Sequence, residues 1–291
     1  MEKIIKLIKS CTDFDELDLP KNIYKYRTWT DSQHKTLLSN QIVYMSSPSD
    51  FEDVKDCKSQ KRYDLLTKDD IYIKYLNDSY KKHPKRTKCQ HEKYATENFK
   101  NSSMHNIEHI TKMQKEHLKD FSEHFGVLSL SANPINNKMW IKYCENHFGI
   151  CVGFDTKKMS KYFFENGKID TKSNYYCYGG GKVNYCKELP MILPNDIFED
   201  EYNKQIFCKE EKWGFEDEYR MLMYFKNNST TNRQIKLPKE CFSEIIFGFN
   251  TSVENKKEII KICNIQKLNV EFKQVVKINE GDVKITSFEN Y

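Results

Sequence analysis

The sequence predicts an α+β domain with a mixed or antiparallel central sheet, flanking helices and one helical insertion. Short apolar runs of strand length recur along the chain, for example at 150–154 and 244–248. Residues 62–122 instead contain no glycine, and their apolar residues are spaced as in helices. An aromatic content of 13% argues against disorder. We therefore expect the 291 residues to form a single domain over 1–291.

The N-terminal part of the chain alternates helical and strand patterns. Residues 1–20 have the pattern of a short amphipathic helix, and residues 23–27 have that of a first strand. The N-cap residue types at the start of 30–38 predict a short helix. A second strand is expected at 41–45, and the turn formers at 46–50 should end it.

The insertion at 62–122 is predicted to contain helices that break at Pro84, because proline lacks the amide donor and clashes with the preceding turn. A basic run surrounds this break: Lys81, Lys82, Lys85, Arg86 and Lys88. Such a run usually marks a solvated face. The alternative is a contact with nucleic acid or with an acidic partner.

A strand at 126–131 carries Ser129 and Ser131 on the face opposite its leucines. A helix is predicted at 138–147, and a central apolar strand at 150–154. The helix repeats its large side chains at three- and four-residue spacing: Met139, Trp140, Tyr143 and His147. A stripe of this kind is more often part of a core than a ligand site.

The glycines at 179–181 could cradle a phosphate, but they form neither a Gly-x-Gly-x-x-Gly motif nor a P-loop. A hairpin over 175–185 is therefore favoured. The same patterns predict the later elements: a helix at 197–211, strands at 215–225, 234–238 and 244–248, a helix at 252–263, and strands at 270–278 and 283–288.

The charged residues of the strand predicted at 215–225 share one parity. Glu216, Glu218 and Arg220 would stand in a row on one face, with the two carboxylates about 7 Å apart. Placing such a row toward an interior is costly unless the charges are paired or used. The two interpretations are a solvent-facing row of salt bridges and a functional site.

The composition favours a reducing cytoplasm. None of the ten cysteines forms a Cys-x-x-Cys pair, and no apolar run approaches membrane-spanning length. Residues 1–10 lack the features of a signal peptide. A zinc site from Cys177, Cys186 and a histidine is conceivable, but the spacing argues against it, so no metal is expected. The net charge of +5 permits a nucleic-acid partner without arguing for one.

Several blocks of sequence together resemble a known family. They are Tyr24-Lys-Tyr-Arg27, the stretch 43–53, the tryptophan-helix block at 139–154, the Glu-x-Glu-Tyr-Arg block within 209–220, and Ile245-Ile-Phe-Gly248. Their order and spacing are similar to DUF2971, a bacterial family of unknown function. The likeness spans about 20–250 without the insertion. The family's Phe-Asn-Asp-Pro-Phe-Asp turn is Phe51-Glu-Asp-Val-Lys-Asp56 here, without the asparagine and proline.

The order Arg27, Ser129-x-Ser131, Glu216-x-Glu218 also resembles the Arg…Ser-x-Ser…Glu-x-Glu layout of ADP-ribosyltransferases. The resemblance implies that NAD is the substrate and that no metal is needed. One carboxylate would stabilise oxocarbenium character on the ribose, and the other would orient or deprotonate the acceptor. Arg27 would hold the pyrophosphate and Ser131 the ribose. Further binding candidates are Tyr26 or Trp140 against nicotinamide, and Tyr143, His147 and Arg220.

An enzyme of this kind would modify a macromolecular acceptor, protein or nucleic acid, and would suit a toxin or an anti-phage effector. The main alternative is a nucleic-acid-directed protein, either a binding module or a nuclease whose Mg²⁺ would be held by Asp53, Asp56, Glu216 and Glu218. A non-catalytic partner-binding protein is a third interpretation. A transferase predicts that Arg27, Ser131 and Glu218 converge on one pocket.

Overall fold

The computed structural model describes residues 19–166, 175–226, 232–279 and 281–288. The helix predicted at 1–20 lies outside these residues except for its last two positions. The described strands are β1 (Asn22–Arg27), β2 (Ile42–Tyr44), β3 (Phe125–Ser131), β4 (Ile150–Asp155), β5 (Tyr175–Lys182), β6 (Asn184–Cys186), β7 (Cys208–Glu210), β8 (Glu218–Phe225), β9 (Gln234–Lys236), β10 (Phe242–Phe247), β11 (Glu271–Lys277) and β12 (Val283–Ser287).

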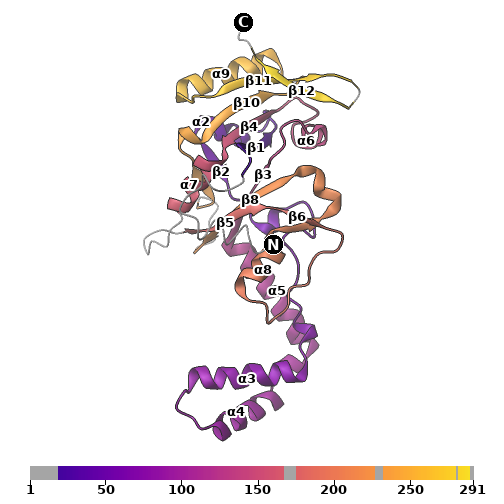
Figure 1. Cartoon of the computed structure of the whole chain (residues 1–291), viewed down its shortest axis with the longest axis vertical. Coiled ribbons are helices and arrows are strands. Elements are labelled where there is room, and N and C mark those ends of the chain that lie inside the picture. The colour runs from indigo at the N-terminus through magenta and orange to yellow at the C-terminus, as the bar shows by residue number, and fades with distance from the viewer. Residues whose placement is uncertain (1–18, 167–174, 227–231, 280, 289–291) are drawn as a thin grey trace.

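The described helices are α2 (Ser32–Ser39), α3 (Lys68–Lys82), α4 (Lys88–Lys100), α5 (Ile107–His124), α6 (Asn137–Tyr143), α7 (Thr156–Asn166), α8 (Phe198–Ile206) and α9 (Val253–Gln266). A 3₁₀ helix, η5 (Glu211–Glu216), precedes β8. The main sheet has the order β12-β11-β10-β4-β1-β3-β8-β5. Only β10 and β11 pair in parallel within it. The predicted α+β fold with a mixed sheet and flanking helices is therefore confirmed (Figure 1).

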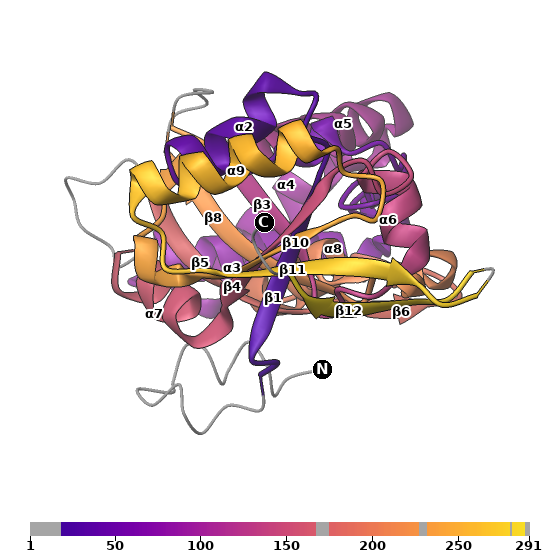
Figure 2. The ribbon, with the colours of Figure 1, turned by 90° about the horizontal axis from the view of Figure 1, so that it is seen from above.

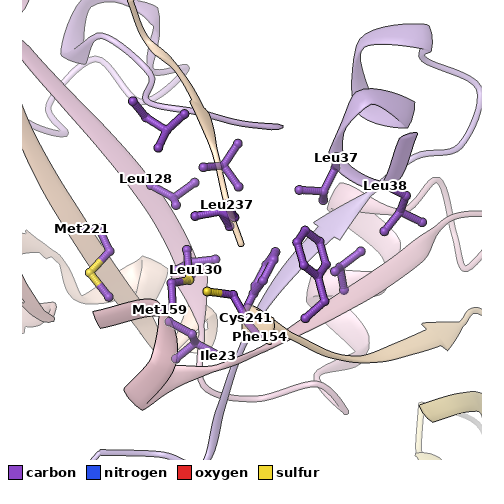
Figure 3. Close-up of a cluster of buried hydrophobic side chains, with 14 of the residues drawn as sticks. Ile23, Leu37, Leu38, Leu128, Leu130, Phe154, Met159, Met221, Leu237 and Cys241 are labelled. Atoms are coloured by element: carbon purple, nitrogen blue, oxygen red, sulfur yellow. The ribbon is translucent and has the colours of Figure 1, made fainter. Parts of the chain in front are cut away.

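One face of the sheet carries the larger apolar core, beneath α2, α7 and α9. Ile23 of β1 and Leu128 of β3 point into it, together with Leu38 of α2 (Figure 3). Helices α2 and α9 lie side by side over this face (Figure 2). Each fully buried leucine or isoleucine contributes about 1.5–3 kcal/mol, so this layer fixes the position of β1 against its neighbours.

The opposite face is covered in two separate places. Helix α6 buries Trp140 against Tyr26 of β1, with ring centroids 5.2 Å apart and nearly perpendicular planes. Helix α8 and the end of α5 cover a second cluster around Val127 of β3 and Leu222 of β8. Ser129 and Ser131 of β3 and Glu218 and Arg220 of β8 share the parity of Val127 and Leu222, so they lie on this face.

The insertion extends away from the sheet as a helical arm (Figure 1). Helices α3 and α4 form an antiparallel hairpin, and α5 leads back to β3. Pro84 lies in the turn between α3 and α4. Four of the five basic residues at this turn are exposed: Lys81, Lys82, Lys85 and Lys88. The guanidinium of Arg86 instead packs over the Tyr94 ring at 5.1 Å.

The glycine hairpin predicted at 175–185 is wrong. The glycines belong to β5, which runs on to Lys182 and pairs with β8. Gly179, with φ +122°, absorbs a shift in the register of this pairing. A Cβ at Gly180 would lie 2.5 Å from Met221 Sδ and 2.9 Å from the backbone oxygen of Arg220, so β5 approaches β8 closely because this position has no side chain.

The helix predicted at 138–147 is shorter than expected and ends at Tyr143. Residues Glu145, Asn146 and His147 all have positive φ. They form a turn that brings the His147 carbonyl against Gly248, where it accepts the Asn250 amide at 3.1 Å. The sequence pattern did not show this turn because the residues are not glycine.

Gly248→Ala tests this close approach. The added Cβ would lie 2.1 Å from His147 O, which belongs to the backbone and cannot rotate away. We expect the free energy of unfolding to fall by about 1–3 kcal/mol. Gly214→Ala is the matched control, because its Cβ would meet only Tyr185 at 3.8 Å. Urea titration of the two variants measures the difference, and equal stability would contradict the packing described here.

Candidate functional site

A cavity of about 250 Å³ opens between β1 and β3. These two strands pair only at Tyr24 and Ser131, whereas β3 and β8 pair over seven residues. The cavity is lined from five directions: Tyr24, Lys25, Tyr26 and Arg27 of β1; Ser129, Leu130 and Ser131 of β3; Ser46, Asp50, Phe51, Glu52, Asp53 and Asp56 of the loop after β2; Met139, Lys142 and Tyr143 of α6; and Lys209, Trp213, Glu216 and Glu218 before and at the start of β8.

Glu216 and Glu218 do not stand in one strand row as predicted. Strand β8 begins at Glu218, while Glu216 ends η5, and Asp217 between them has φ +41°. Both carboxylates are nevertheless buried and line the same cavity. Their shared contact is Lys209, whose Nζ lies 2.5 Å from Glu216 Oε2 and 3.1 Å from Glu218 Oε2. Their burial excludes the solvent-facing row of salt bridges.

Arg220 lies beneath the cavity and does not line it. Its side chain is fully buried and donates two hydrogen bonds to Glu218, at 2.7 and 2.9 Å. A third bond reaches Asp56 Oδ2 at 2.7 Å, and a fourth reaches the Ile206 carbonyl at 2.6 Å. Arg220 therefore positions the carboxylates of Glu218 and Asp56. It has no surface in the cavity through which it could bind a ligand.

The neighbouring cations keep Glu218 ionised. Burial alone would raise the pKa of Glu218, but the charges of Arg220 and Lys209 outweigh it and lower the pKa to about 2. For Lys209, burial opposes the ammonium form, and attraction by Glu218 and Asp56 outweighs it and raises the pKa. Asp56, Glu216, Glu218, Lys209 and Arg220 thus form a buried ionic network with one more negative than positive charge.

Lys209 is the residue of this network that the sequence analysis did not single out, and Asp56 was considered there only as a Mg²⁺ ligand. Lys209 opens the Glu-x-Glu-Tyr-Arg block and lies seven residues before Glu216. It reaches the carboxylates from β7, a strand of three residues that the apolar pattern did not reveal. Asp56 ends the turn that departs from the DUF2971 pattern, and it still reaches both Lys209 and Arg220.

Tyr143 and Tyr26 border the cavity with their hydroxyls already engaged. The Tyr143 hydroxyl donates to Glu216 Oε1 at 2.6 Å, and burial together with this carboxylate raises the pKa of Tyr143. The Tyr26 hydroxyl donates to the Asn133 carbonyl at 2.6 Å. Ser131 Oγ accepts the Asn133 amide at 3.1 Å. Tyr143 therefore orients Glu216, while Tyr26 lines the cavity with a ring that also packs against Trp140.

Arg27 and Lys25 enter the cavity from β1 without a carboxylate partner. Within the part of the chain that the structure describes, no carboxylate lies within 4.0 Å of either side chain. Among the described residues, Arg27 thus forms no ion pair with Glu218 or Asp53. Burial lowers the pKa of Arg27 to about 10, so the guanidinium remains charged at neutral pH. It is available to an anionic ligand.

Trp140 and His147 do not line the cavity. Trp140 is fully buried and donates its Nε1 hydrogen to the Pro134 carbonyl at 2.8 Å. His147 stacks between Trp140 and Phe249, and its Nε2 lies 2.7 Å from Asn137 Oδ1. Burial lowers the pKa of His147 to about 4. Both residues have the contacts of a core stripe, as their spacing favoured.

The carboxylates of the cavity surround an ammonium group. Among the residues the structure describes, no group of three His, Cys, Asp or Glu side chains is arranged to hold a metal ion. Asp56, Glu216 and Glu218 all contact Lys209 Nζ, at the position from which a cation would bind all three. Of the two cysteines considered for zinc, Cys186 is half-buried and the Cys177 side chain lies outside the described residues.

Comparison with known proteins identifies one family. Residues 139–221 match the family model of DUF2971, described as a protein of unknown function. The match confirms the resemblance over this stretch, which contains the tryptophan helix and the Glu-x-Glu-Tyr-Arg block. Searches of the curated proteins and of solved structures found no match. None of the described helices is long and apolar enough to cross a membrane.

The depressed pKa of Glu218 makes stability depend on pH. Its folded value is about 2, against an ordinary value of 4.5. Because the folded pKa is the lower one, this carboxylate stabilises the fold fully above pH 4.5, and the contribution is lost as pH falls toward 2. The shift corresponds to about 3 kcal/mol. We expect urea titrations to show Glu218→Gln less stable than wild type by about this amount at pH 7, and the gap to narrow below pH 4.5.

Glu211→Gln is the control for this experiment, because Glu211 is exposed on η5 and outside the ionic network. Its stability should follow that of wild type at every pH. A Glu218→Gln variant that stayed parallel to wild type down to pH 3 would show that Glu218 is not held ionised by its neighbours.

Proposed function

We propose that the cavity binds NAD and cleaves its nicotinamide–ribose bond, passing the ADP-ribosyl group to a macromolecular acceptor or to water. The observation that supports this most is the convergence of Arg27, Ser131 and Glu218 on one cavity. They come from three adjacent strands, β1, β3 and β8, which are distant in the sequence. Ser131 is paired with Tyr24 of β1 on one side and with Glu218 of β8 on the other.

Arg27 supplies the contact for the pyrophosphate. Its guanidinium is charged, lines the cavity and has no carboxylate partner among the described residues. A guanidinium binds phosphate oxygens through two parallel N–H donors, and such bonds are roughly twice as strong as neutral ones. An anionic ligand would therefore satisfy a group that the protein itself leaves without a counterion.

The carboxylates supply the electrostatic part of the reaction. The nicotinamide nitrogen leaves with the electron pair of its bond to ribose C1′, and positive charge develops on the ribose. The excess negative charge of the ionic network lies beside it and stabilises that charge in a site of low dielectric. The acceptor oxygen then forms the new bond to C1′ and releases its proton.

Glu216 fits the role of proton acceptor better than Glu218. Glu218 is fixed from below by the two hydrogen bonds of Arg220 and from the side by Lys209. Among the described residues, the Glu216 carboxylate accepts hydrogen bonds only from Tyr143 and Lys209. One of its oxygens can therefore release the Tyr143 hydroxyl and accept a hydrogen bond from the acceptor hydroxyl instead. We therefore assign Glu218 to electrostatic stabilisation and Glu216 to orienting or deprotonating the acceptor.

The size of the cavity sets which part of NAD it holds. At about 250 Å³ it falls below the range of about 300–1,000 Å³ typical of pockets for drug-sized ligands. It suits the nicotinamide riboside end with the pyrophosphate at Arg27, and the adenosine would extend past the rim. The Tyr26 ring is the proposed platform for nicotinamide. Trp213, with Lys142 Nζ 3.9 Å from its ring, is a second aromatic wall that the sequence did not single out.

The exposed α3–α4 turn supports a second proposal, a contact with nucleic acid as partner or acceptor. Lys81, Lys82, Lys85 and Lys88 are exposed at the far end of the arm, and no acidic residue occurs between 81 and 88. Of these four lysines, only Lys82 and Lys88 approach a carboxylate among the described residues, at 3.8 and 3.9 Å. An enzyme that modifies a macromolecule delivered by this arm would suit a toxin or an anti-phage effector.

Incubation with NAD tests the first proposal. We expect wild type to release nicotinamide, and Glu216→Gln and Glu218→Gln to lose a factor of about 10² or more in kcat. Arg27→Met should mainly raise KM. Glu211→Gln should be as active as wild type, and thermal melts must show each variant folded. If wild type releases no nicotinamide, even with cell extract supplied as acceptor, the proposal fails.

Binding of labelled RNA and DNA tests the second proposal. Lys81→Glu/Lys85→Glu should weaken binding uniformly across sequences and flatten its dependence on salt concentration, since each phosphate contact contributes about −0.9 to the slope on duplex DNA. Lys112→Glu/Lys115→Glu, which changes two exposed lysines of α5, is the control for net charge. Fluorescence anisotropy at several salt concentrations gives the slopes. Equal weakening by both double variants would remove the arm as a specific contact.

A further inference from the structure

Lys25 is a lysine of the cavity that the proposed reaction does not use. It lies on β1 between Tyr24 and Tyr26, at the point where β1 and β3 cease to pair. The side chain is half-buried and lines the cavity. Its Nζ donates a hydrogen bond to the Ser129 carbonyl at 2.5 Å. Among the described residues, no carboxylate oxygen lies within 4.0 Å of this nitrogen.

Burial and the neighbouring Arg27 oppose the ammonium form of Lys25. Burial has the largest effect and lowers the pKa of Lys25, followed by repulsion from Arg27, two residues further along β1. Glu218 and Glu216 attract the ammonium form from across the cavity, and Lys209 repels it. The net result is a pKa well below the ordinary value. A desolvated lysine beside another cation is a known arrangement for a nucleophilic amine.

Lys209 provides the contrast within the same cavity. Its Nζ contacts Asp56, Glu216 and Glu218, and their attraction outweighs burial and keeps it an ammonium ion. Lys25 has only the Ser129 carbonyl. A carbonyl oxygen accepts hydrogen bonds and donates none, so the lone pair of a neutral Lys25 amine remains free. Lys209 is therefore held as an ammonium ion in this cavity, whereas Lys25 has the contacts expected of a nucleophilic amine.

We propose that Lys25 captures a small carboxylate-bearing aldehyde or ketone as an imine in this cavity. The Nζ lone pair attacks the carbonyl carbon and forms a carbinolamine. The amine gives up its two hydrogens, the carbonyl oxygen leaves as water, and a carbon–nitrogen double bond remains. Arg27, charged and without a carboxylate partner, binds the carboxylate of the same molecule.

This chemistry does not rest on NAD cleavage. It uses the amine of Lys25, while the bond cleavage proposed for NAD uses the carboxylates that precede and begin β8, and the two proposals share only Arg27 as the group that binds an anion. Labelling of Lys25 can be observed without NAD, so the failure of one proposal leaves the other standing. Covalent capture also needs no metal or oxidant, because an imine forms from an amine and a carbonyl compound with loss of water alone.

Reductive trapping tests the proposal. Purified full-length protein is incubated at pH 7 with glyoxylate and cyanoborohydride, and peptides are mapped by mass spectrometry over time. We expect Lys25 to be modified at least about tenfold faster than exposed Lys85 and paired Lys209, since each unit of pKa below the ordinary value changes the amine fraction about tenfold. Lys25→Arg keeps a long basic side chain but has no primary amine, so it should remove the fast phase.

A neutral aldehyde separates the roles of the two residues. Propionaldehyde has the same reactive group without a carboxylate, so it should label Lys25 more slowly than glyoxylate does. Arg27→Met should lower the ratio of the glyoxylate rate to the propionaldehyde rate at Lys25, whatever it does to the pKa of the amine. Modification of Lys25 no faster than that of Lys85, or a fast phase that survives Lys25→Arg, would overturn the proposal.

Discussion

The two hydrogen bonds between Arg220 and Glu218 are the interaction on which the rest of the site depends. Arg220 is fully buried, and a buried guanidinium is tolerated only when its donors are satisfied. Its remaining bonds to Asp56 and to the Ile206 carbonyl join the loop after β2 and the end of α8 to strand β8. Removal of any one member would leave uncompensated buried charge, which costs several kcal/mol. The network therefore holds these segments together, and it also supplies charged groups that line the cavity.

The cavity itself exists because the sheet is incomplete between β1 and β3. Strand β1 is fully paired with β4 over six residues, and β3 with β8 over seven, but β1 and β3 share a single pair. The apolar layer under α2, α7 and α9 still holds the two strands in one sheet from the opposite face. Met139, Lys142 and Tyr143 of α6 border the opening between β1 and β3.

The sequence correctly predicted the face on which a side chain lies where this depended only on alternation within one strand. Parity correctly placed Ser129 with Ser131 and Glu218 with Arg220. It failed where the chain left regular structure, because Asp217 turns left-handed and separates Glu216 from β8. The α6 stripe was ambiguous, since spacing alone does not distinguish a core position such as Trp140 from the cavity-lining Tyr143.

Lys25 and Lys209 show why the remaining part of the site could not be predicted. Lys25 shares its parity with Ile23, which points into the apolar core, so alternation alone directs it away from the cavity. The gap beside β3 lets its long side chain reach the Ser129 carbonyl instead. Lys209 arrives from a strand of three residues.

The positions of Lys25 and Lys209 depend on which strands are neighbours in the structure. The sequence pattern of a single segment does not contain that information. The same placement gives the side chains of Lys25 and Lys209 different electrostatic surroundings. One is surrounded by carboxylates, and the other lies beside a guanidinium. The opening between β1 and β3 therefore provides an anion-binding arginine, a charged lysine and a lysine that favours the neutral form within one cavity.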